Sequence, residues 1–288
     1  MMDFIADIQQ YSFLQNALIT SIMVGVICGV IGSFIIMRGM ALMGDAISHA
    51  VLPGVAISYM LGINYFYGAV FFGVISAVGI VVVSQNSRIK NDSAIGIVFT
   101  AFFALGVILI SKAQTATDLT QILFGSVLSV RQSDMIMTLI IGIIVLLVVI
   151  LFYKELLIST FDETMAAAYG LPTKWIHYGI MVLLTLTTVA SLQTVGVVLV
   201  VAMLITPAST AYLLTNKFSL MIVLAAFFGA LSSVIGLYVS SEYNLESGAV
   251  IVLAATCMFL LAFIFSPKQG ILWRSIRSRK SKATAENI

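Results

Sequence analysis

The chain has 288 residues and a formal net charge of +2, and 61% of its residues are hydrophobic. Only 9% are charged, against about 25% in a typical soluble domain, so its 14 basic and 12 acidic side chains cannot coat a water-facing surface of this size. These values exclude a soluble globular protein. They indicate a polytopic protein of the lipid bilayer, and no nucleic-acid partner is expected.

Polar residues divide the chain into nine apolar segments, each close to the 20 or so residues that a membrane-spanning helix needs. We therefore predict an all-α protein with about eight or nine transmembrane helices. The second segment is the least hydrophobic, because it contains Asp45 and His49. The sixth and seventh are separated only by Gln193 and Thr194, so they form either a tight hairpin or one broken helix. The nine segments lie near 14–37, 42–61, 65–84, 94–112, 135–153, 176–192, 194–215, 219–240 and 248–266.

The positions of the basic residues predict the direction of insertion. Lys and Arg in short loops collect on the cytoplasmic side. If the first segment ends inside at Arg38, strict alternation places six loop residues and six tail residues inside, which is twelve of the fourteen basic residues. We therefore expect an external N-terminus and a cytoplasmic C-terminus. Residues 1–268 form the predicted transmembrane domain, and residues 269–288 form a basic cytoplasmic tail.

The loop 155–175 between two predicted spans has the signals of a short cytoplasmic helix. Thr160 and Glu163 fit a capping box, which predicts a helix start at this point. Gly170 suits the left-handed position after a helix, and Pro172 prevents continuation. The loop is either a connector on the membrane surface or a docking element for a cytoplasmic protein, and composition alone leaves both interpretations open.

The most informative stretch runs from Arg38 to Gly54 and contains Asp45 and His49. Their spacing of four places both side chains on one face of a helix, where one cation or proton can contact both. Pro53 lacks the N–H that would bond the carbonyl of His49, so it frees that oxygen or kinks the helix. Carboxylate and imidazole together suit Mn²⁺, Zn²⁺ or Fe²⁺ better than Cu(I). The alternative is that Asp45 caps the helix and His49 bonds a neighbouring helix.

Three further polar positions are weaker candidates. Asp92 is a second candidate metal ligand, although its place at the start of the fourth segment favours a helix cap. Thr206 and Pro207 interrupt the seventh segment and either line a pathway or form a kink. His177, beside the cytoplasmic loop, is interpreted as an interfacial anchor.

Several of these motifs together resemble the ABC-3 family, the permeases of manganese, zinc and iron importers. The stretch from Arg38 to Gly54 is similar to the family signature, and the motifs Asp92–Ile97 and Leu204–Ala211 also follow its pattern. The segment Glu163–Gly170 is similar to the degenerate Glu-Ala-Ala…Gly loop of ABC-importer permeases. The similarity extends from about residue 10 to residue 268 and is greatest to the manganese branch of Gram-positive bacteria.

The resemblance implies a homodimeric permease in the bacterial plasma membrane, working with cytoplasmic ATPase subunits and an extracellular metal-binding lipoprotein. The transported ion would be Mn²⁺, or Zn²⁺ or Fe²⁺, and no cofactor would be bound permanently. Asp45 and His49 match the family's intramembrane metal position. Residues 161–170 match its coupling helix, which contacts the ATPase. The implied coupling residues are Asp162, Glu163, Ala167 and Gly170.

A secondary transporter and an intramembrane hydrolase are the alternatives to an ATP-driven importer. A secondary transporter would use Asp45 and His49 to carry a driving ion, but a matching pair in the second half is missing. An intramembrane hydrolase would need His-Glu-x-x-His or a second intramembrane aspartate, and the sequence has neither. The chain also lacks the G-x-x-x-x-G-K-[ST] motif of P-loop ATPases, so its energy must come from another subunit and it is not itself an enzyme.

Overall fold

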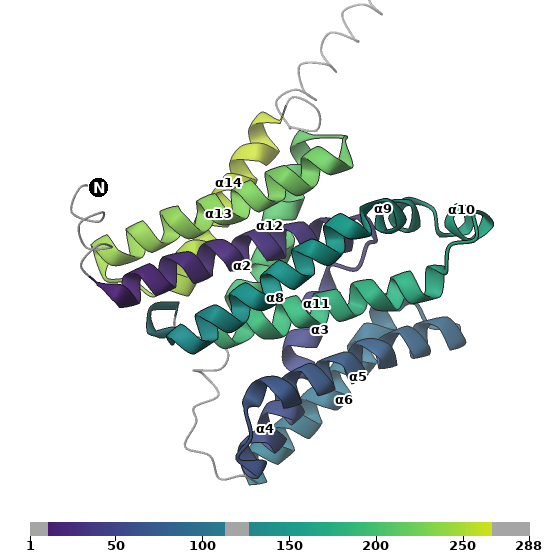
Figure 1. The fold of residues 1–288 in the computed structure, drawn as a ribbon, viewed down its shortest axis with the longest axis horizontal. Coiled ribbons are helices and arrows are strands. Elements are labelled where there is room, and N and C mark those ends of the chain that lie inside the picture. The colour runs from purple at the N-terminus through teal and green to yellow at the C-terminus, as the bar shows by residue number, and fades with distance from the viewer. Residues whose placement is uncertain (1–10, 113–126, 267–288) are drawn as a thin grey trace, which may run out of the picture.

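The computed structural model describes residues 11–112 and 127–266, and within these ranges all regular secondary structure is helical (Figure 1). Among the described residues, eight helices are long and apolar enough to cross a membrane. They are α2 (Ser12–Met37), α5 (Tyr65–Asn86), α6 (Asn91–Lys112), α8 (Gln132–Leu151), α11 (Thr173–Val195), α12 (Val197–Leu214), α13 (Phe218–Tyr243) and α14 (Ser247–Phe265). The all-α prediction is confirmed. The predicted tail 269–288 lies outside the described residues, and the direction of insertion stays a prediction.

Five shorter helices complete the described part of the chain. They are α3 (Leu42–Ala50), α4 (Leu52–Leu61), the 3₁₀ turn η1 (Val127–Ser129), α9 (Tyr153–Phe161) and α10 (Glu163–Ala168). The predicted second span, 42–61, is therefore not one continuous helix but the pair α3 and α4, divided at Val51. Pro53 lies directly after this break, as expected for a residue that cannot donate a backbone hydrogen bond to the preceding turn.

The boundary between the predicted sixth and seventh spans lies two residues later than expected. A single residue, Gly196, separates α11 from α12, and its φ of +81° is readily adopted only by glycine. The chain therefore turns sharply at this point instead of forming one long helix. Pro207 does not interrupt α12, which continues to Leu214.

The first long helix, α2, is the central element of the bundle. It packs against α13, α12, α8 and α11, and Figure 1 shows it lying between α13 and α8. Small residues allow the closest of these contacts. A Cβ atom added to Gly25 would lie 2.5 Å from the carbonyl oxygen of Gly229 in α13. Close backbone approach of this kind stabilises helix pairs in lipid, where apolar burial by itself drives little association.

We expect Gly25→Ala to destabilise the folded protein by about 1–3 kcal/mol, because the new methyl group must push α2 away from α13. The matched control is Gly179→Ala in α11, where an added Cβ meets nothing within 4 Å. Alanine is favoured over glycine in a helix interior by about 1 kcal/mol, so this control should be neutral or stabilising. The midpoint of thermal unfolding in detergent measures the stability of each variant against wild type. Equal midpoints for the two variants would contradict the packing argument.

Candidate functional site

Asp45 and His49 lie on one face of α3, one helical turn apart. The distance between His49 Nε2 and Asp45 Oδ1 is 3.5 Å. The Asp45 side chain is 45% exposed and that of His49 is 19% exposed. Neither residue caps the helix. The N-cap of α3 is Ala41, which makes no side-chain cap bond, so the interpretation of Asp45 as a helix cap is wrong.

Aromatic side chains of α6 hold the His49 ring in place. Phe99 and Phe103 both meet the imidazole edge to face, each with a centroid separation of 5.6 Å. His49 Nδ1 is buried and has no hydrogen-bond partner. The nitrogen that approaches Asp45 is therefore Nε2, and packing rather than hydrogen bonding orients the ring.

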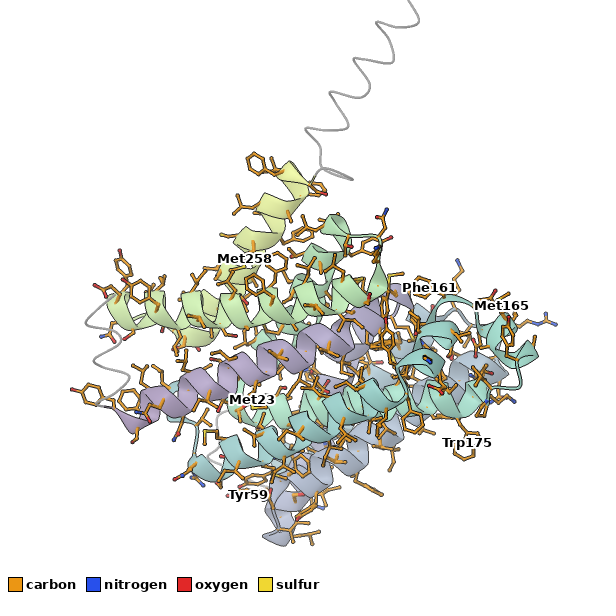
Figure 2. All side chains as sticks on the ribbon, turned by 45° about the horizontal axis from the view of Figure 1, so that its top comes forward. Met23, Tyr59, Phe161, Met165, Trp175 and Met258 are labelled. Atoms are coloured by element: carbon orange, nitrogen blue, oxygen red, sulfur yellow. The ribbon has the colours of Figure 1, made fainter. Side chains whose placement is uncertain are left out.

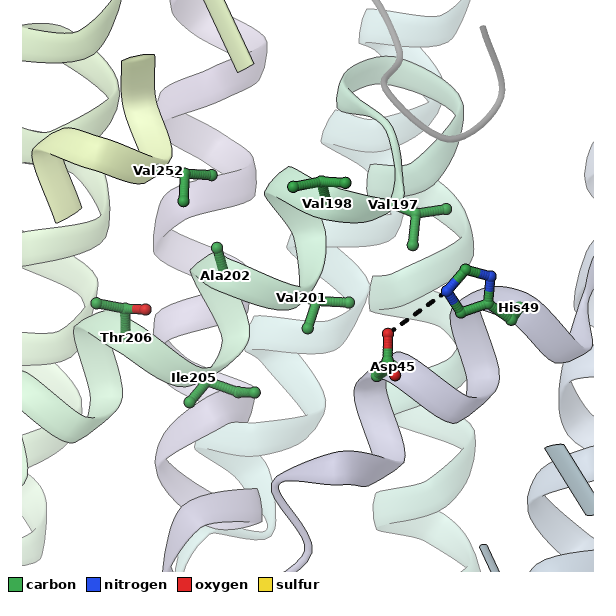
Figure 3. A pocket seen from close by; sticks show the side chains of 9 residues that line it. All are labelled: Asp45, His49, Val197, Val198, Val201, Ala202, Ile205, Thr206 and Val252. Atoms are coloured by element: carbon green, nitrogen blue, oxygen red, sulfur yellow. Dashed lines mark ion pairs between the residues drawn. The ribbon is translucent and has the colours of Figure 1, made fainter. Parts of the chain in front are cut away.

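Asp45 and His49 line a cavity of about 370 Å³, whose opposite wall is formed mainly by one face of α12 (Figure 3). Thr206 is one of the lining residues, and its role in a pathway stays a prediction. The rest of the wall is aliphatic, so Asp45 and His49 are the only ionisable groups among the described residues that line it. The remaining lining residues are Val197, Val198, Val201, Ala202, Ile205 and Thr206 from α12 and Val252 from α14.

This geometry suits one cation held between two side chains. Two ligand atoms that each lie about 2.1 Å from the same ion are separated by about 3.0–3.4 Å, close to the 3.5 Å between His49 Nε2 and Asp45 Oδ1. The pair offers hard oxygen and borderline nitrogen ligands, a set that accepts Mn²⁺, Fe²⁺ and Zn²⁺. The described residues contain no group of three or more His, Cys, Asp or Glu side chains, so within them the ligand set is incomplete.

Asp92, the weaker candidate ligand, does not belong to this cavity. It lies exposed in the first turn of α6, seven residues before Phe99, which corresponds to about 10 Å along the helix axis. The structure therefore brings Asp45 and His49 together and leaves Asp92 at the end of a neighbouring helix.

The loop between α8 and α11 contains two short helices, and the cap of the second differs from the predicted one. Thr160 does not cap a helix. It lies inside α9, and its hydroxyl donates to the Leu156 carbonyl oxygen at 2.6 Å. The N-cap of α10 is Asp162, whose Oδ1 accepts from the Thr164 hydroxyl at 2.7 Å and from the Met165 N–H at 2.9 Å. These bonds lower the pKa of the Asp162 carboxyl, so the cap is ionised at neutral pH and is lost only on acidification through that lowered value.

The end of α10 agrees with the prediction. Gly170 has a φ of +79°. Its N–H donates to Ala167 at 2.9 Å, and the N–H of Leu171 donates to Ala166 at 3.1 Å. These two bonds make a Schellman turn, which satisfies carbonyl groups that the helix leaves unpaired.

The surface of α10 is open to a partner. Ala166 is fully buried and anchors the helix, whereas the rest of the segment 161–170 is exposed. Large apolar side chains project beside it: Met165 is 53% exposed, Tyr169 72% and Trp175 77%. Figure 2 shows Met165 and Trp175 at the same end of the molecule as Phe161. Exposed apolar clusters of this kind occur at contacts with other proteins or with the membrane.

Sequence reasoning missed the side-chain partners of Arg38, the residue that follows α2. Its guanidinium contacts His177 of α11 and two hydroxyl groups of α9, those of Ser159 and Thr160. The interpretation of His177 as a simple interfacial anchor therefore omitted its closest partner. The arginine at the end of the first apolar segment could have indicated these contacts. Its guanidinium keeps its charge and needs hydrogen-bond acceptors when it is half-buried.

Comparisons with known proteins agree with this architecture. The profile of the ABC 3 transport family matches residues 10–266. The chain is 67% identical over 274 residues to the manganese transport system membrane protein MntC of Listeria monocytogenes, covering 95% of this chain and 98% of that protein. It is 60% identical over 286 residues to MntC of Halalkalibacterium halodurans, covering 98% of each. The solved structure of PsaBC from Streptococcus pneumoniae in complex with Fab matches with a TM-score of 0.85 and 52% identity, over 93% of this chain and 98% of that one.

Proposed function

Because the chain belongs to the ABC 3 transport family, we propose that it is the membrane permease subunit of an ATP-binding cassette importer for a divalent transition metal, most specifically Mn²⁺. It is a multi-pass protein of the bacterial plasma membrane. The observation that carries the metal assignment is the Asp45–His49 pair facing an open pocket lined by α12 and α14. Family membership decides against the ion-coupled secondary transporter.

In this proposal Asp45 and His49 bind the ion in transit. An ion that loses its water inside the bilayer needs compensating charge, and Asp45 supplies it beside the His49 imidazole. A transport site must bind tightly enough to admit the ion and weakly enough to release it. Two side chains, with the other positions left to water or to a partner, meet that requirement better than a closed cage. We infer that the ion is substrate and that no metal is held permanently.

The incomplete ligand set also supports the proposed homodimer. Asp45 is 45% exposed in one chain, although a bare carboxylate facing lipid is costly. A second copy packed against this side would cover it and bring another carboxylate and imidazole towards the ion. The dimer would thus supply four residues of a type that Mn²⁺ accepts.

Energy and delivery require two other partners in this proposal. A cytoplasmic ATPase would dock on α10 and on the exposed Met165, Tyr169 and Trp175. The residues that form this contact or hold α10 in shape for it would be Asp162, Glu163, Ala167 and Gly170. An extracellular metal-binding lipoprotein would deliver the ion at the opposite end. The permease itself would carry out no hydrolysis.

The test is transport in proteoliposomes that contain the permease, its ATPase and the binding protein. We expect Mn²⁺ uptake that requires hydrolysable ATP and persists when an ionophore collapses ion gradients. Competition with Zn²⁺ and Fe²⁺ identifies the preferred ion. Uptake that follows an ion gradient without ATP would overturn the proposal.

A further inference from the structure

Arg38 joins three separate elements at the end of the molecule that carries α9. Its Nη2 donates to Ser159 Oγ at 2.7 Å, and its Nε donates to Thr160 Oγ1 at 3.3 Å. Its Nη1 lies 2.9 Å from His177 Nδ1. The end of α2 is thus bonded to α9 and to the first turns of α11, across more than 120 residues of sequence in each case.

The direction of each bond follows from the chemistry of arginine. A guanidinium donates and cannot accept, so His177 Nδ1 must accept, which leaves its proton on Nε2. The Thr160 hydroxyl oxygen accepts from Arg38, and the same hydroxyl donates to the Leu156 carbonyl oxygen within α9. Burial lowers the pKa of Arg38, and the charge of Glu163 at the start of α10 opposes that shift, so the group stays charged. The network therefore has one arrangement of donors and acceptors.

A hydrogen-bonded turn connects Arg38 to α3, the helix that carries Asp45 and His49. The turn after α2 is a second Schellman turn, in which the N–H of Gly39 donates to Ile36 at 3.1 Å and that of Met40 donates to Ile35 at 3.0 Å. Gly39 has a φ of +68°, and Met40 is buried. The next bond, from the N–H of Met43 to Met40, starts α3. Asp45 follows two residues later.

The Arg38 side chain also contacts the last residues of α9, which directly precede α10. Ser159 and Thr160 precede Asp162, the cap of α10, by only two or three residues. A displacement of α10 must move the end of α9, because one residue separates the two helices. The Arg38 side chain therefore provides a hydrogen-bonded path from the end of α9 to the turn that leads into α3.

We propose that Arg38 is a positioning residue for transport, which transmits the movement of α9 and α10 to α3 and so links the state of the ATPase to the Asp45–His49 pair. This inference rests on the proposed function. Arg38 is not among the residues that line the Asp45–His49 pocket. It acts through Ser159, Thr160 and His177, which hold it against α9 and α11.

The fold does not depend on this link alone. Phe161 of α9 stacks edge to face on Phe218 at 5.6 Å, and Phe218 stacks in the same way on Phe34 of α2 at 5.0 Å. This aromatic path keeps α9 beside the end of α2 when the Arg38 bonds are removed. A variant at Arg38 should therefore fold, bind metal and bind the ATPase.

The test compares Arg38→Gln with wild type in proteoliposomes, by the number of Mn²⁺ ions transported per ATP hydrolysed. We expect this ratio to fall about 10-fold, within the range found for residues that carry coupling between sites. Equilibrium Mn²⁺ binding to the permease, recovery of the ATPase on purification and the ATP hydrolysis rate should stay within about twofold of wild type. Arg38→Lys should be intermediate, because a single ammonium cannot reproduce the planar fork of donors. The matched control is Arg88→Gln, an exposed arginine in the loop between α5 and α6, which should leave the ratio unchanged.

An unchanged ratio in Arg38→Gln would overturn the inference. So would loss of Mn²⁺ binding or of the ATPase, since either would assign Arg38 a purely structural role. If Arg38→Gln does not accumulate, the pair Ser159→Ala and Thr160→Val removes two acceptors from the other side, and the same ratio decides. A wild-type complex that transports no Mn²⁺ would instead contradict the proposed function.

Discussion

Asp45→Asn should abolish most metal uptake while the protein still inserts and folds. The substitution keeps the shape of the side chain and removes the charge that compensates a divalent ion in the cavity. His49→Ala should have a similar effect, because it removes the nitrogen that lies 3.5 Å from the carboxylate. Each change is expected to lower Mn²⁺ affinity by at least about 10- to 100-fold, since even groups that only support metal ligands have effects of that size. Uptake by cells and equilibrium binding to purified permease measure the two effects.

The double variant separates a shared site from two independent roles. If one ion needs both ligands, the combination of Asp45→Asn and His49→Ala should be little worse than either change alone, because residues that act as a unit are not additive. The matched comparison is Asp92→Asn, at an exposed position outside the cavity, where uptake should stay near wild type. Normal uptake of manganese, zinc and iron by Asp45→Asn cells would refute the site assignment.

Gly170→Val should uncouple the permease from its ATPase without preventing membrane insertion. Gly170 has a φ of +79°, and an added Cβ atom would meet nothing within 4 Å, so the substitution tests mainly the backbone conformation. A residue with a Cβ atom in this conformation costs about 1–2 kcal/mol, and a β-branched one more. The Schellman turn should therefore open and change the angle at which α10 meets its partner. Recovery of the ATPase on purification and Mn²⁺ uptake should both fall.

Gly170→Asn is the control for this experiment. Asparagine adopts the left-handed conformation more readily than other residues with a Cβ atom, so it should retain the turn and most of the activity. A Gly170→Val protein that binds the ATPase and takes up metal normally would show that α10 is only a connector, the alternative that composition left open.

Features that depend on neighbouring residues were predictable from the sequence. Apolar segments of about 20 residues must become helices in lipid, because each backbone polar group needs a partner within the segment. The spacing of Asp45 and His49 places them on one face of any helix. Gly170 ends α10 as expected, because only local backbone conformation is involved. The sequence predicts Thr160 as the cap of α10, whereas the structure has Asp162 in that position. Both residue types cap helices, and the contact of Thr160 with the distant Arg38 is not visible in the local sequence.

Features that depend on residues far apart in the chain required the tertiary structure. No local pattern places the apolar face of α12 opposite Asp45, or the rings of Phe99 and Phe103 around His49. The contacts of Arg38 with Ser159 and His177 span 121 and 139 residues. Periodicity along one helix shows which side chains share a face, but not which helix covers that face. Packing of the whole bundle decides this, because close contacts such as that between Gly25 and Gly229 allow only certain helices to be neighbours.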